Sequence, residues 1–306
     1  MAVETEMTEA LGAAAGRPGE AGGGSARERQ LERLRQRAAE LRRTVFGTIC
    51  RGGGGHIPAS LSIVEILTVL YEAVLRVDPA RPHDPQRDRF ILSKGHGCVA
   101  LYAALAAKGF FPPEQLATYG QAGTMLGGHP DMHKTPGVEA STGSLGHGLA
   151  FGAGMALAGK LDKKDYRVFV LLGDGECQEG SVWEAALFAA QHKLDHLTAI
   201  IDYNQLQALD RLEEVVELAP LAAKWGAFGW AVREVDGHGV GELMDVLTAA
   251  PLAAGRPTAV VAHTIKGKGI SFMENVPIWH YRLPDEQERR QACAELGMAD
   301  PLEGGP

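Results

Sequence analysis

Apolar residues in the first part of the chain recur with a helical period. Between residues 27 and 50 they occur every three or four positions, and arginines and glutamates fill the positions between them. The members of this stripe are Leu31, Leu34, Ala38, Leu41 and Val45. The pattern predicts a surface helix that packs against the protein by its leucines. A glycine-rich turn follows, and Ser60 or Ser62 is the candidate cap of the next, strongly apolar helix.

The second half of the chain alternates between short apolar runs and longer helical patterns. The apolar runs are RVFVLL, LTAIIDY, WAVREVD and TAVVAHT, and an earlier run, FILS, precedes a Gly-His-Gly turn. The helical patterns are SVWEAALFAAQHK, LAAKWGAFG and VGELMDVLTAA. Strands that alternate with helices form parallel sheets through right-handed crossovers. We therefore predict an α/β fold, a doubly wound and mostly parallel sheet with helices on both faces.

Composition and length restrict the class of protein. The chain has 306 residues, is 45% apolar and carries a net charge of −8, so it can bury a full core, and no basic block indicates a nucleic-acid partner. The four cysteines form no CxxC pair, which argues against a zinc site or a disulfide framework and favours the cytoplasm. No apolar run is long enough to span a membrane. We expect a disordered leader at residues 1–25, one domain at 26–285, and a C-terminal helix and tail at 286–306.

Polar residues follow two of the predicted strands. LLGDGE places Asp174 between two glycines, and IIDYNQLQ places Asn204 after the next strand, 29 positions beyond Gly175. Ligands of parallel sheets bind beyond the carboxyl ends of the strands, so both side chains should face one crevice. Their oxygens suit Mg²⁺ or Ca²⁺, and the glycines let a phosphate approach the backbone. This spacing in this context is typical of thiamine diphosphate binding.

Seven motifs in a consistent order make the chain resemble a known family. They are GGGGHIPASLS, DRFILSKGHG, GGHPD, STGSLGHG, GDGECQEGSVWEA, HTIKGKG and WHYRLP, all between residues 27 and 284. With this set, the sequence resembles the N-terminal, diphosphate-binding (PP) domain of transketolases. The resemblance implies transfer of a two-carbon ketol unit from a ketose phosphate to an aldose phosphate. It also implies thiamine diphosphate and Mg²⁺ as cofactors, with Ca²⁺ or Mn²⁺ as alternative metals.

The resemblance assigns cofactor and metal to particular residues. The metal ligands would be Asp174, Asn204 and the main-chain carbonyl of Leu206. The positions that would bind the cofactor are His96, Gly143, Ser144, Leu145, Gly173, Gly175, Glu176, Asn204, Lys266 and His280. Glu176 is the least defined of these, because the residues around it indicate only an acid in a loop or at a helix start.

The catalytic candidates are His56, His96, His129 and His280. Ketol transfer needs an electron sink, which a thiazolium ring supplies, and groups that move protons on sugar oxygens near neutral pH. The resemblance places His56 and His129 against the substrate and Arg282 near the acceptor's phosphate. His147 and Tyr281 stand where relatives commonly carry other residues, and either would change which sugar fits.

A complete transketolase continues with further domains that this sequence lacks. The second domain supplies the glutamate that contacts the aminopyrimidine ring of the cofactor. Because ADPLEGGP reads as a natural terminus, we expect a split enzyme whose partner chain carries the pyrimidine-binding domain, assembled as an α2β2 heterotetramer. The chain alone would then be inactive or nearly so. Glu179 and Glu184 match glutamates of a network at the subunit interface of the family.

Three alternatives to a sugar-phosphate transketolase stay open. An E1-like decarboxylating subunit of a 2-oxo acid dehydrogenase shares the Gly-Asp-Gly to Asn spacing but gives no reason for the histidines of SKGHG and GGHPD. A split transketolase dedicated to a specialised ketose would keep every motif. A non-catalytic diphosphate-binding subunit would lose the four histidines, and all four are present.

Overall fold

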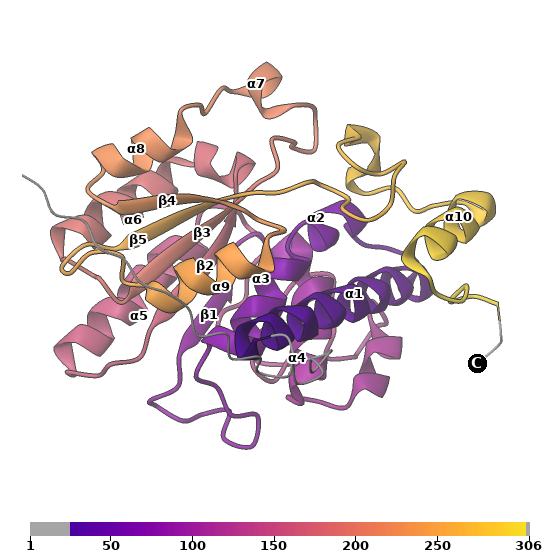
Figure 1. Cartoon of the computed structure of the whole chain (residues 1–306), viewed down its shortest axis with the longest axis horizontal. Helices are drawn as coiled ribbons and strands as arrows, with labels where there is room; N and C mark the ends of the chain where they lie inside the picture. Colours follow the sequence, from indigo (N-terminus) through magenta and orange to yellow (C-terminus); the bar gives the residue numbers. More distant parts are fainter. Residues whose placement is uncertain (1–24, 304–306) are drawn as a thin grey trace, which may run out of the picture.

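A parallel sheet runs through the part of the chain that the computed structural model describes, residues 25–303 (Figure 1). Its five strands in that range are β1 (Arg89–Leu92), β2 (Val168–Gly173), β3 (Leu197–Tyr203), β4 (Ala231–Asp236) and β5 (Thr258–His263). Their order across the sheet is β1-β2-β3-β5-β4, and every neighbouring pair is parallel. The predicted fold class is confirmed.

Helices connect the strands and cover the sheet. They are α1 (Ala26–Gly52), α2 (Ile57–Leu61), α3 (Val64–Val69), α4 (Cys98–Lys108), α5 (Gly148–Leu161), α6 (Gly180–Gln191), α7 (Leu212–Val215), α8 (Leu221–Ala227), α9 (Val240–Ala249) and α10 (Glu286–Leu296). Single turns of 3₁₀ or π-helix lie between them, at η1 (Leu70–Val74), η2 (Gly95–Gly97), η3 (Pro113–Thr118), η4 (Gly175–Gln178) and η5 (Pro277–His280).

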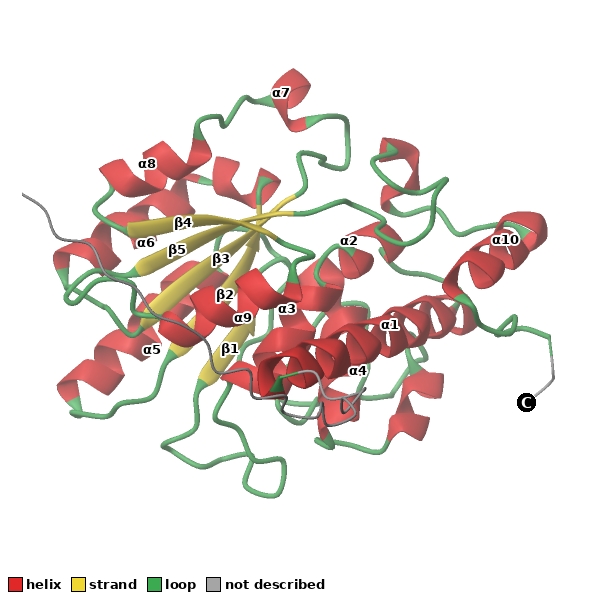
Figure 2. Cartoon of the chain, in the orientation of Figure 1, coloured by secondary structure: helices red, strands yellow, loops and turns green. Residues whose placement is uncertain are grey.

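Both faces of the sheet are covered, as its apolar runs predict. Along β2, Phe169 and Leu171 join an apolar cluster with α1, α3, α4 and α9. The alternate residues, Val168 and Val170, join a second cluster with α5, α6 and α8. Successive side chains of a strand point to opposite faces, so a strand buried on both sides is apolar throughout. Figure 2 shows the strands between these two helical layers.

The first helix follows its leucine stripe. Ser25 and Glu28 form a capping box at its start, and most of the predicted stripe is buried in the first cluster. Phe46 and Ile49 are also fully buried, so the second half of α1 is covered on more than the predicted face. The predicted leader, residues 1–25, lies outside the described residues except for Ser25.

The predicted serine caps are wrong. Helix α2 begins at Ile57 with His56 at its N-cap, and α3 begins at Val64 with Ile63 at its N-cap. A proline in the first turn of α2 starts that helix before either serine, because its fixed φ suits a first turn. Ser62 therefore ends α2, and its hydroxyl donates to the carboxylate of Asp202, 2.8 Å away.

The C-terminal helix packs on the rest of the fold. Asp285 caps α10 through a capping box, and Ala292 and Cys293 lie in the same apolar cluster as α1. Helix α10 begins at Glu286 and packs on the domain core, and the division of the chain at residues 285 and 286 stays a prediction. Among the helices described, none combines the length and apolarity that a membrane crossing requires.

Polar residues follow the carboxyl ends of four neighbouring strands. Lys94 comes after β1, Asp174 after β2, Asn204 after β3 and Lys266 after β5. Since the strands are parallel, all four ends lie on the same edge of the sheet. The fold therefore assembles one polar site from segments that are far apart in the sequence.

Candidate functional site

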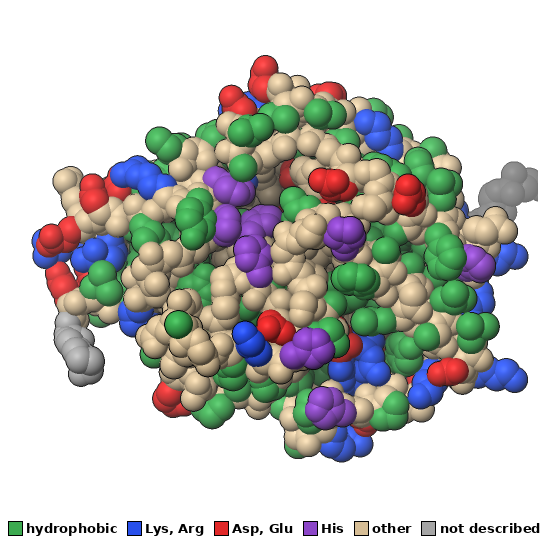
Figure 3. All heavy atoms as spheres, turned by 180° about the vertical axis from the view of Figure 1, so that it is seen from behind, with side chains coloured by type: hydrophobic (Ala, Val, Ile, Leu, Met, Phe, Trp, Pro, Cys, Tyr) green, Lys and Arg blue, Asp and Glu red, His purple; other side chains and the backbone are tan. Residues whose placement is uncertain are grey.

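A cavity of about 360 Å³ opens at this edge of the sheet. Of the residues predicted to form the site, those that line it are His56, His96, His129, Gly143, Leu145, Gly173, Asp174, Gly175, Glu176, Asn204, Leu206, Lys266 and His280. Figure 3 shows several histidine side chains gathered around a hollow on this face of the molecule. The volume is within the range of sites for small molecules.

The four predicted histidines converge on this cavity. The ring centroid of His56 lies 5.1 Å from His96, 5.1 Å from His280 and 6.5 Å from His129. Each comes from a different segment, so only the fold brings them together. Gly143 permits the approach of His129, because it has φ 154° and a Cβ there would lie 3.0 Å from the imidazole. One bound molecule can therefore contact several of these rings at once.

The predicted metal ligands lie on two adjacent loops. Asp174 follows β2 and is 2% exposed, and its carboxylate accepts hydrogen bonds from the main-chain N–H of Gly175 and Gln205. Asn204 and Leu206 flank Gln205, whose φ of 61° is unusual for a residue other than glycine. Asn204 and Leu206, on either side of this left-handed residue, both line the cavity.

Burial shifts the pKa values of two charged side chains of the cavity, Asp174 and Lys266, away from their ordinary values. Burial, with the nearby charge of Asp202, raises the pKa of Asp174 to about 7. Burial and the charge of Lys94 lower the pKa of Lys266 to about 8. The ammonium of Lys266 donates to the carbonyl of Leu206 at 2.8 Å, so that carbonyl already accepts a cationic donor. A bound divalent cation would stabilise the ionised form of Asp174.

Three histidines of the cavity, His56, His96 and His280, are neutral at physiological pH. Burial is the main reason that the pKa of His56 falls to about 4 and that of His280 to about 3. Burial also lowers the pKa of His96 well below its ordinary value. A neutral imidazole has one nitrogen that donates and one that accepts, so these rings can bind hydroxyl groups and exchange protons with them.

The residues present fit a phosphorylated cofactor held through a metal ion. Gln207 Nε2 and His280 Nδ1 are buried in the cavity wall without a hydrogen-bond partner in the described part of the chain. Polar atoms of a bound molecule would satisfy both, an acceptor in the case of Gln207 Nε2. No cluster of three or more His, Cys, Asp or Glu side chains that could hold a metal occurs in residues 25–303. A site of one carboxylate, one amide and one carbonyl oxygen instead suits Mg²⁺, which takes its other ligands from phosphate and water.

Comparison with known proteins agrees with this geometry. The family model described as transketolase, thiamine diphosphate binding domain, matches residues 34–302. The chain belongs to the transketolase family. The family prediction and the thiamine diphosphate-binding domain are thereby confirmed.

The relatives fall into two length classes. A protein of Clostridium sp. named 6-deoxy-6-sulfo-D-fructose transketolase subunit is 45% identical over 88% of this chain and 98% of its own length. A protein of Phocaeicola vulgatus, named as one of the subunits of apulose-4-phosphate transketolase, is 42% identical over 87% of this chain and 95% of its own. Human transketolase is 41% identical over 88% of this chain but only 43% of its own length.

Solved transketolase structures share the fold. The transketolase from Leishmania mexicana superposes with a TM-score of 0.82 and 28% identity, over 88% of this chain and 42% of that one. In length, this chain thus resembles the proteins named as subunits and corresponds to less than half of a single-chain transketolase.

Glu176 lies in the cavity wall but its oxygens are already bound. They accept hydrogen bonds from the hydroxyl of Ser93 and from the main-chain N–H of Gly146 and Gly173, at 2.9 and 3.0 Å for the latter two. Burial raises the pKa of this carboxyl above its ordinary value. These bonds connect the loop before α5 to the turn after β2. A contact between Glu176 and the cofactor stays a prediction.

Four predicted residues lie outside the cavity wall. Ser144 is exposed beside Leu145, and Glu179 and Glu184 are exposed at the start of α6. The guanidinium of Arg282 donates twice to Glu288, at 2.7 and 2.9 Å, and lies 4.1 Å from the ring centroid of Trp279. The roles predicted for these residues stay predictions.

Two buried residues of the site were missed by sequence reasoning. Lys94 lines the cavity, and its ammonium forms an ion pair with Asp202, which is fully buried at the end of β3. The available signal was an aspartate inside the otherwise apolar run LTAIIDY, since a buried acid needs a partner. The sequence does not say which cation supplies it.

Proposed function

We propose that this chain is the diphosphate-binding subunit of a split, thiamine diphosphate- and Mg²⁺-dependent transketolase. The reaction moves a two-carbon ketol unit from a ketose phosphate to an aldose phosphate, together with a partner chain. Location in the cytoplasm is part of the proposal, and it agrees with four buried cysteines that are all unpaired.

The observation that carries this proposal is the convergence of four histidines beside the Asp174 loop. Sugar substrates present several hydroxyl groups, and an imidazole can bind one and accept or return its proton. A protein that only bound the diphosphate would need the Asp174 and Asn204 loops but not this cluster. An E1-like chain that decarboxylates 2-oxo acids gives no reason for it either.

The cofactor would be held by the residues at the base of the cavity. Asp174, Asn204 and the Leu206 carbonyl would bind the metal, with Ca²⁺ or Mn²⁺ as substitutes, and Lys266 and His96 lie beside them on the same wall. The bound cofactor supplies a thiazolium ring as the electron sink. Around it, His56 and the other histidines bind the substrate and move its protons.

A partner chain would complete the site. On α5 and α6, four large apolar side chains are exposed: Phe151 at 46%, Leu161 at 73%, Leu187 at 57% and Phe188 at 40%. Helices α5 and α6 contact each other, and exposed large apolar side chains on neighbouring helices are a common feature of protein interfaces. We assign this face to the assembly of an α2β2 heterotetramer in which the partner supplies the pyrimidine-binding domain. Glu179 and Glu184, which are exposed on the same helix or at its start, would lie in that interface.

A specialised ketose is the second candidate substrate. Two relatives of similar length to this chain are named for 6-deoxy-6-sulfo-D-fructose and for apulose 4-phosphate. In this chain, the exposed ring of Tyr281 lies 4.7 Å from the ring centroid of His56, next to the histidine cluster. A large side chain there restricts the size of a sugar that reaches His56.

The test is reconstitution with the partner. The chain is co-expressed with a C-terminal transketolase chain and assayed with xylulose 5-phosphate, apulose 4-phosphate or 6-deoxy-6-sulfofructose and an aldose phosphate, with and without thiamine diphosphate and Mg²⁺. We expect transfer that requires both chains, the cofactor and the metal, and that His56→Ala reduces by at least about 100-fold. Decarboxylation of a 2-oxo acid without ketol transfer would refute the proposal.

A further inference from the structure

Asp202 is a fully buried acid to which the sequence assigns no role. It is 0% exposed at the end of β3, and both of its carboxylate oxygens accept hydrogen bonds. Oδ2 accepts from Lys94 Nζ, from Ser62 Oγ at 2.8 Å and from Asn204 Nδ2 at 3.0 Å. Oδ1 accepts from Thr264 Oγ1. All the hydrogen-bonding capacity of the carboxylate is thus directed to side chains rather than to the cavity.

The donors come from separate parts of the fold, so the carboxylate is held in one orientation. Ser62 ends α2, Lys94 follows β1 and Thr264 follows β5. Lys94 also donates to the carbonyl of Ala59 at 3.0 Å. With donors from three separate elements on its two oxygens, the carboxylate is fixed in place.

This arrangement determines which atom of Asn204 is left for a ligand. An Asn side chain has one acceptor end and one donor end. Asp202 binds the donor end, Nδ2, and so Oδ1 points the other way, where the main-chain N–H of Leu206 donates to it at 3.1 Å. Oδ1 is also the atom that a hard cation requires.

We infer that Asp202 is a positioning residue that fixes the amide of Asn204 so that its oxygen is presented to the metal. The inference rests on the proposed function for the nature of the ligand. Groups that orient metal ligands without touching the metal commonly contribute 10- to 100-fold in affinity, roughly. Lys94 donates to Asp202 and to the carbonyl of Ala59, and so it helps to hold the carboxylate that orients Asn204.

Two substitutions separate positioning from simple stability. Asp202→Ala removes both carboxylate oxygens, which leaves Nδ2 of Asn204 with only the main-chain carbonyl of residue 202, at 3.4 Å, and so weakens the hold on the amide. Asp202→Asn keeps one oxygen for Lys94 and Asn204, and its amide group can donate to the hydroxyl of Thr264. Both variants lose the charge that pairs with Lys94 and should be less stable, but only the alanine variant should lose the orientation of Asn204.

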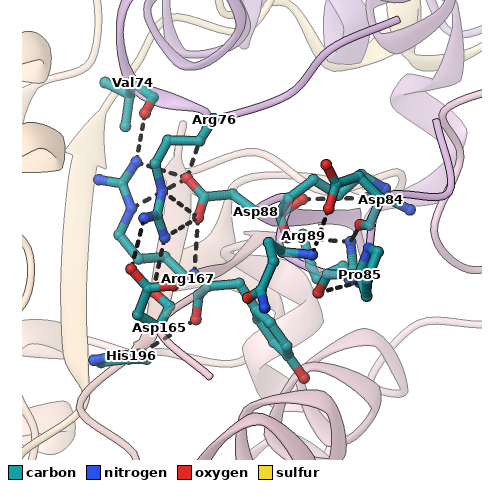
Figure 4. Close-up of polar contacts among 12 residues, drawn as sticks. Val74, Arg76, Asp84, Pro85, Asp88, Arg89, Asp165, Arg167 and His196 are labelled. Carbon is teal, nitrogen blue, oxygen red and sulfur yellow. Dashed lines mark hydrogen bonds and ion pairs between the residues drawn. The ribbon is translucent and has the colours of Figure 1, made fainter. Parts of the chain in front are cut away.

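Asp88 provides the matched control at the opposite end of the sheet. It too is 0% exposed, and it pairs with Arg76 and Arg167 (Figure 4). It lies just before β1, whereas the cavity lies beyond the carboxyl ends of the strands. Asp88→Ala should therefore destabilise the fold without changing the metal site.

The first measurement is the Mg²⁺ concentration at which thiamine diphosphate binding by the reconstituted two-chain enzyme is half complete, followed by tryptophan fluorescence. We expect an increase of about 10- to 100-fold for Asp202→Ala. For Asp202→Asn and Asp88→Ala we expect less than about threefold. Equal weakening in both Asp202 variants, or none in Asp202→Ala, would overturn the inference.

Crystal structures of the full chain carrying each Asp202 variant give a second, independent result. Asn204 should keep its amide orientation in Asp202→Asn and lose it in Asp202→Ala. An unchanged orientation in Asp202→Ala would overturn the positioning role even with no cofactor present. If the wild-type enzyme binds no thiamine diphosphate at any Mg²⁺ concentration, the proposed function fails, and the orientation of Asn204 still tests Asp202.

Discussion

Buried charged side chains at the two ends of the central sheet differ in their hydrogen-bond partners. Before β1, Asp88 accepts hydrogen bonds from the side chains and main-chain N–H groups of Arg76 and Arg167, and Arg76 also pairs with Asp165. At the carboxyl end, Asp174 has only main-chain donors, and its pKa is raised to about 7. Buried nitrogen atoms of Gln207 and His280 lack hydrogen-bond partners there within the described chain.

The difference separates a structural end from a functional one. Where every buried charge has a partner in the same chain, the polar groups serve the fold. Where buried polar groups lack partners in the chain, a bound molecule can supply the missing hydrogen bonds or charge. Asp202 shows that the two kinds meet at the carboxyl end, since it is fully paired and yet directs Asn204 toward the cavity.

The largest effect is expected for Asp174→Ala. Loss of the proposed metal ligand should weaken cofactor binding and activity of the two-chain enzyme by more than about 100-fold, beyond the loss typical of residues that only orient a ligand. The free chain should be as stable as wild type or more so, because a buried carboxylate without a cation is removed. Cofactor titration and urea unfolding measure the two effects, and retained binding would contradict the metal assignment.

Asp88→Ala should show the reverse. It leaves two arginines without their carboxylate and should reduce the free energy of unfolding by about 3 kcal/mol, the lower end for a broken buried pair, because Arg76 is half exposed. Cofactor affinity should not change. A loss of less than about 1 kcal/mol in urea unfolding would mean that this network is not what stabilises the amino end.

The ends should also differ in their response to acid. The folded pKa values of His56 and His280, about 4 and 3, lie below their ordinary 6.5, so the unfolded chain binds more protons between those values. The stability that these two histidines contribute is present above pH 6.5 and is lost as pH falls toward 4. The pKa of Asp88 is also lowered, so its contribution is lost only below its ordinary 3.8.

Urea unfolding of the free chain at a series of pH values tests this order. Wild type should lose stability relative to a His56→Gln, His280→Gln double variant as pH falls from 6.5 to 4. Relative to Asp88→Ala, the corresponding loss should begin only below about pH 4. If the free energies of unfolding of wild type and the double variant differ by the same amount at every pH from 6.5 to 4, these histidines are not buried as neutral groups.

The smallest effect is expected for Arg282→Ala. Its guanidinium is engaged with Glu288 and Trp279, and it must leave them to reach an acceptor phosphate. The exposed pair should contribute less than about 1 kcal/mol to stability. The KM for the aldose phosphate should rise less than about tenfold with kcat unchanged, and Glu288→Ala, which frees the arginine, should not raise it. A larger rise for Arg282→Ala would show that Arg282 contacts the acceptor directly.

Local patterns were enough to predict the layers of the fold. Apolar runs that alternate with helical stripes gave the parallel sheet and both helical faces, and both are confirmed. The predicted helix caps were wrong because a second helix-start signal lies close to the serines in the sequence. Ser60 and Ser62 are good capping residues, but a proline starts α2 earlier and Ser62 binds Asp202 instead.

The sequence by itself determined the family, the residues that follow each strand, and the histidines of the cavity, because short motifs in order carry that information. The tertiary structure alone decided the partners of buried charges. Lys94 and Asp202 are 108 positions apart, and no periodicity relates them. They meet because parallel strands bring distant segments to one edge, where a buried acid is stable only beside whichever cation the fold delivers.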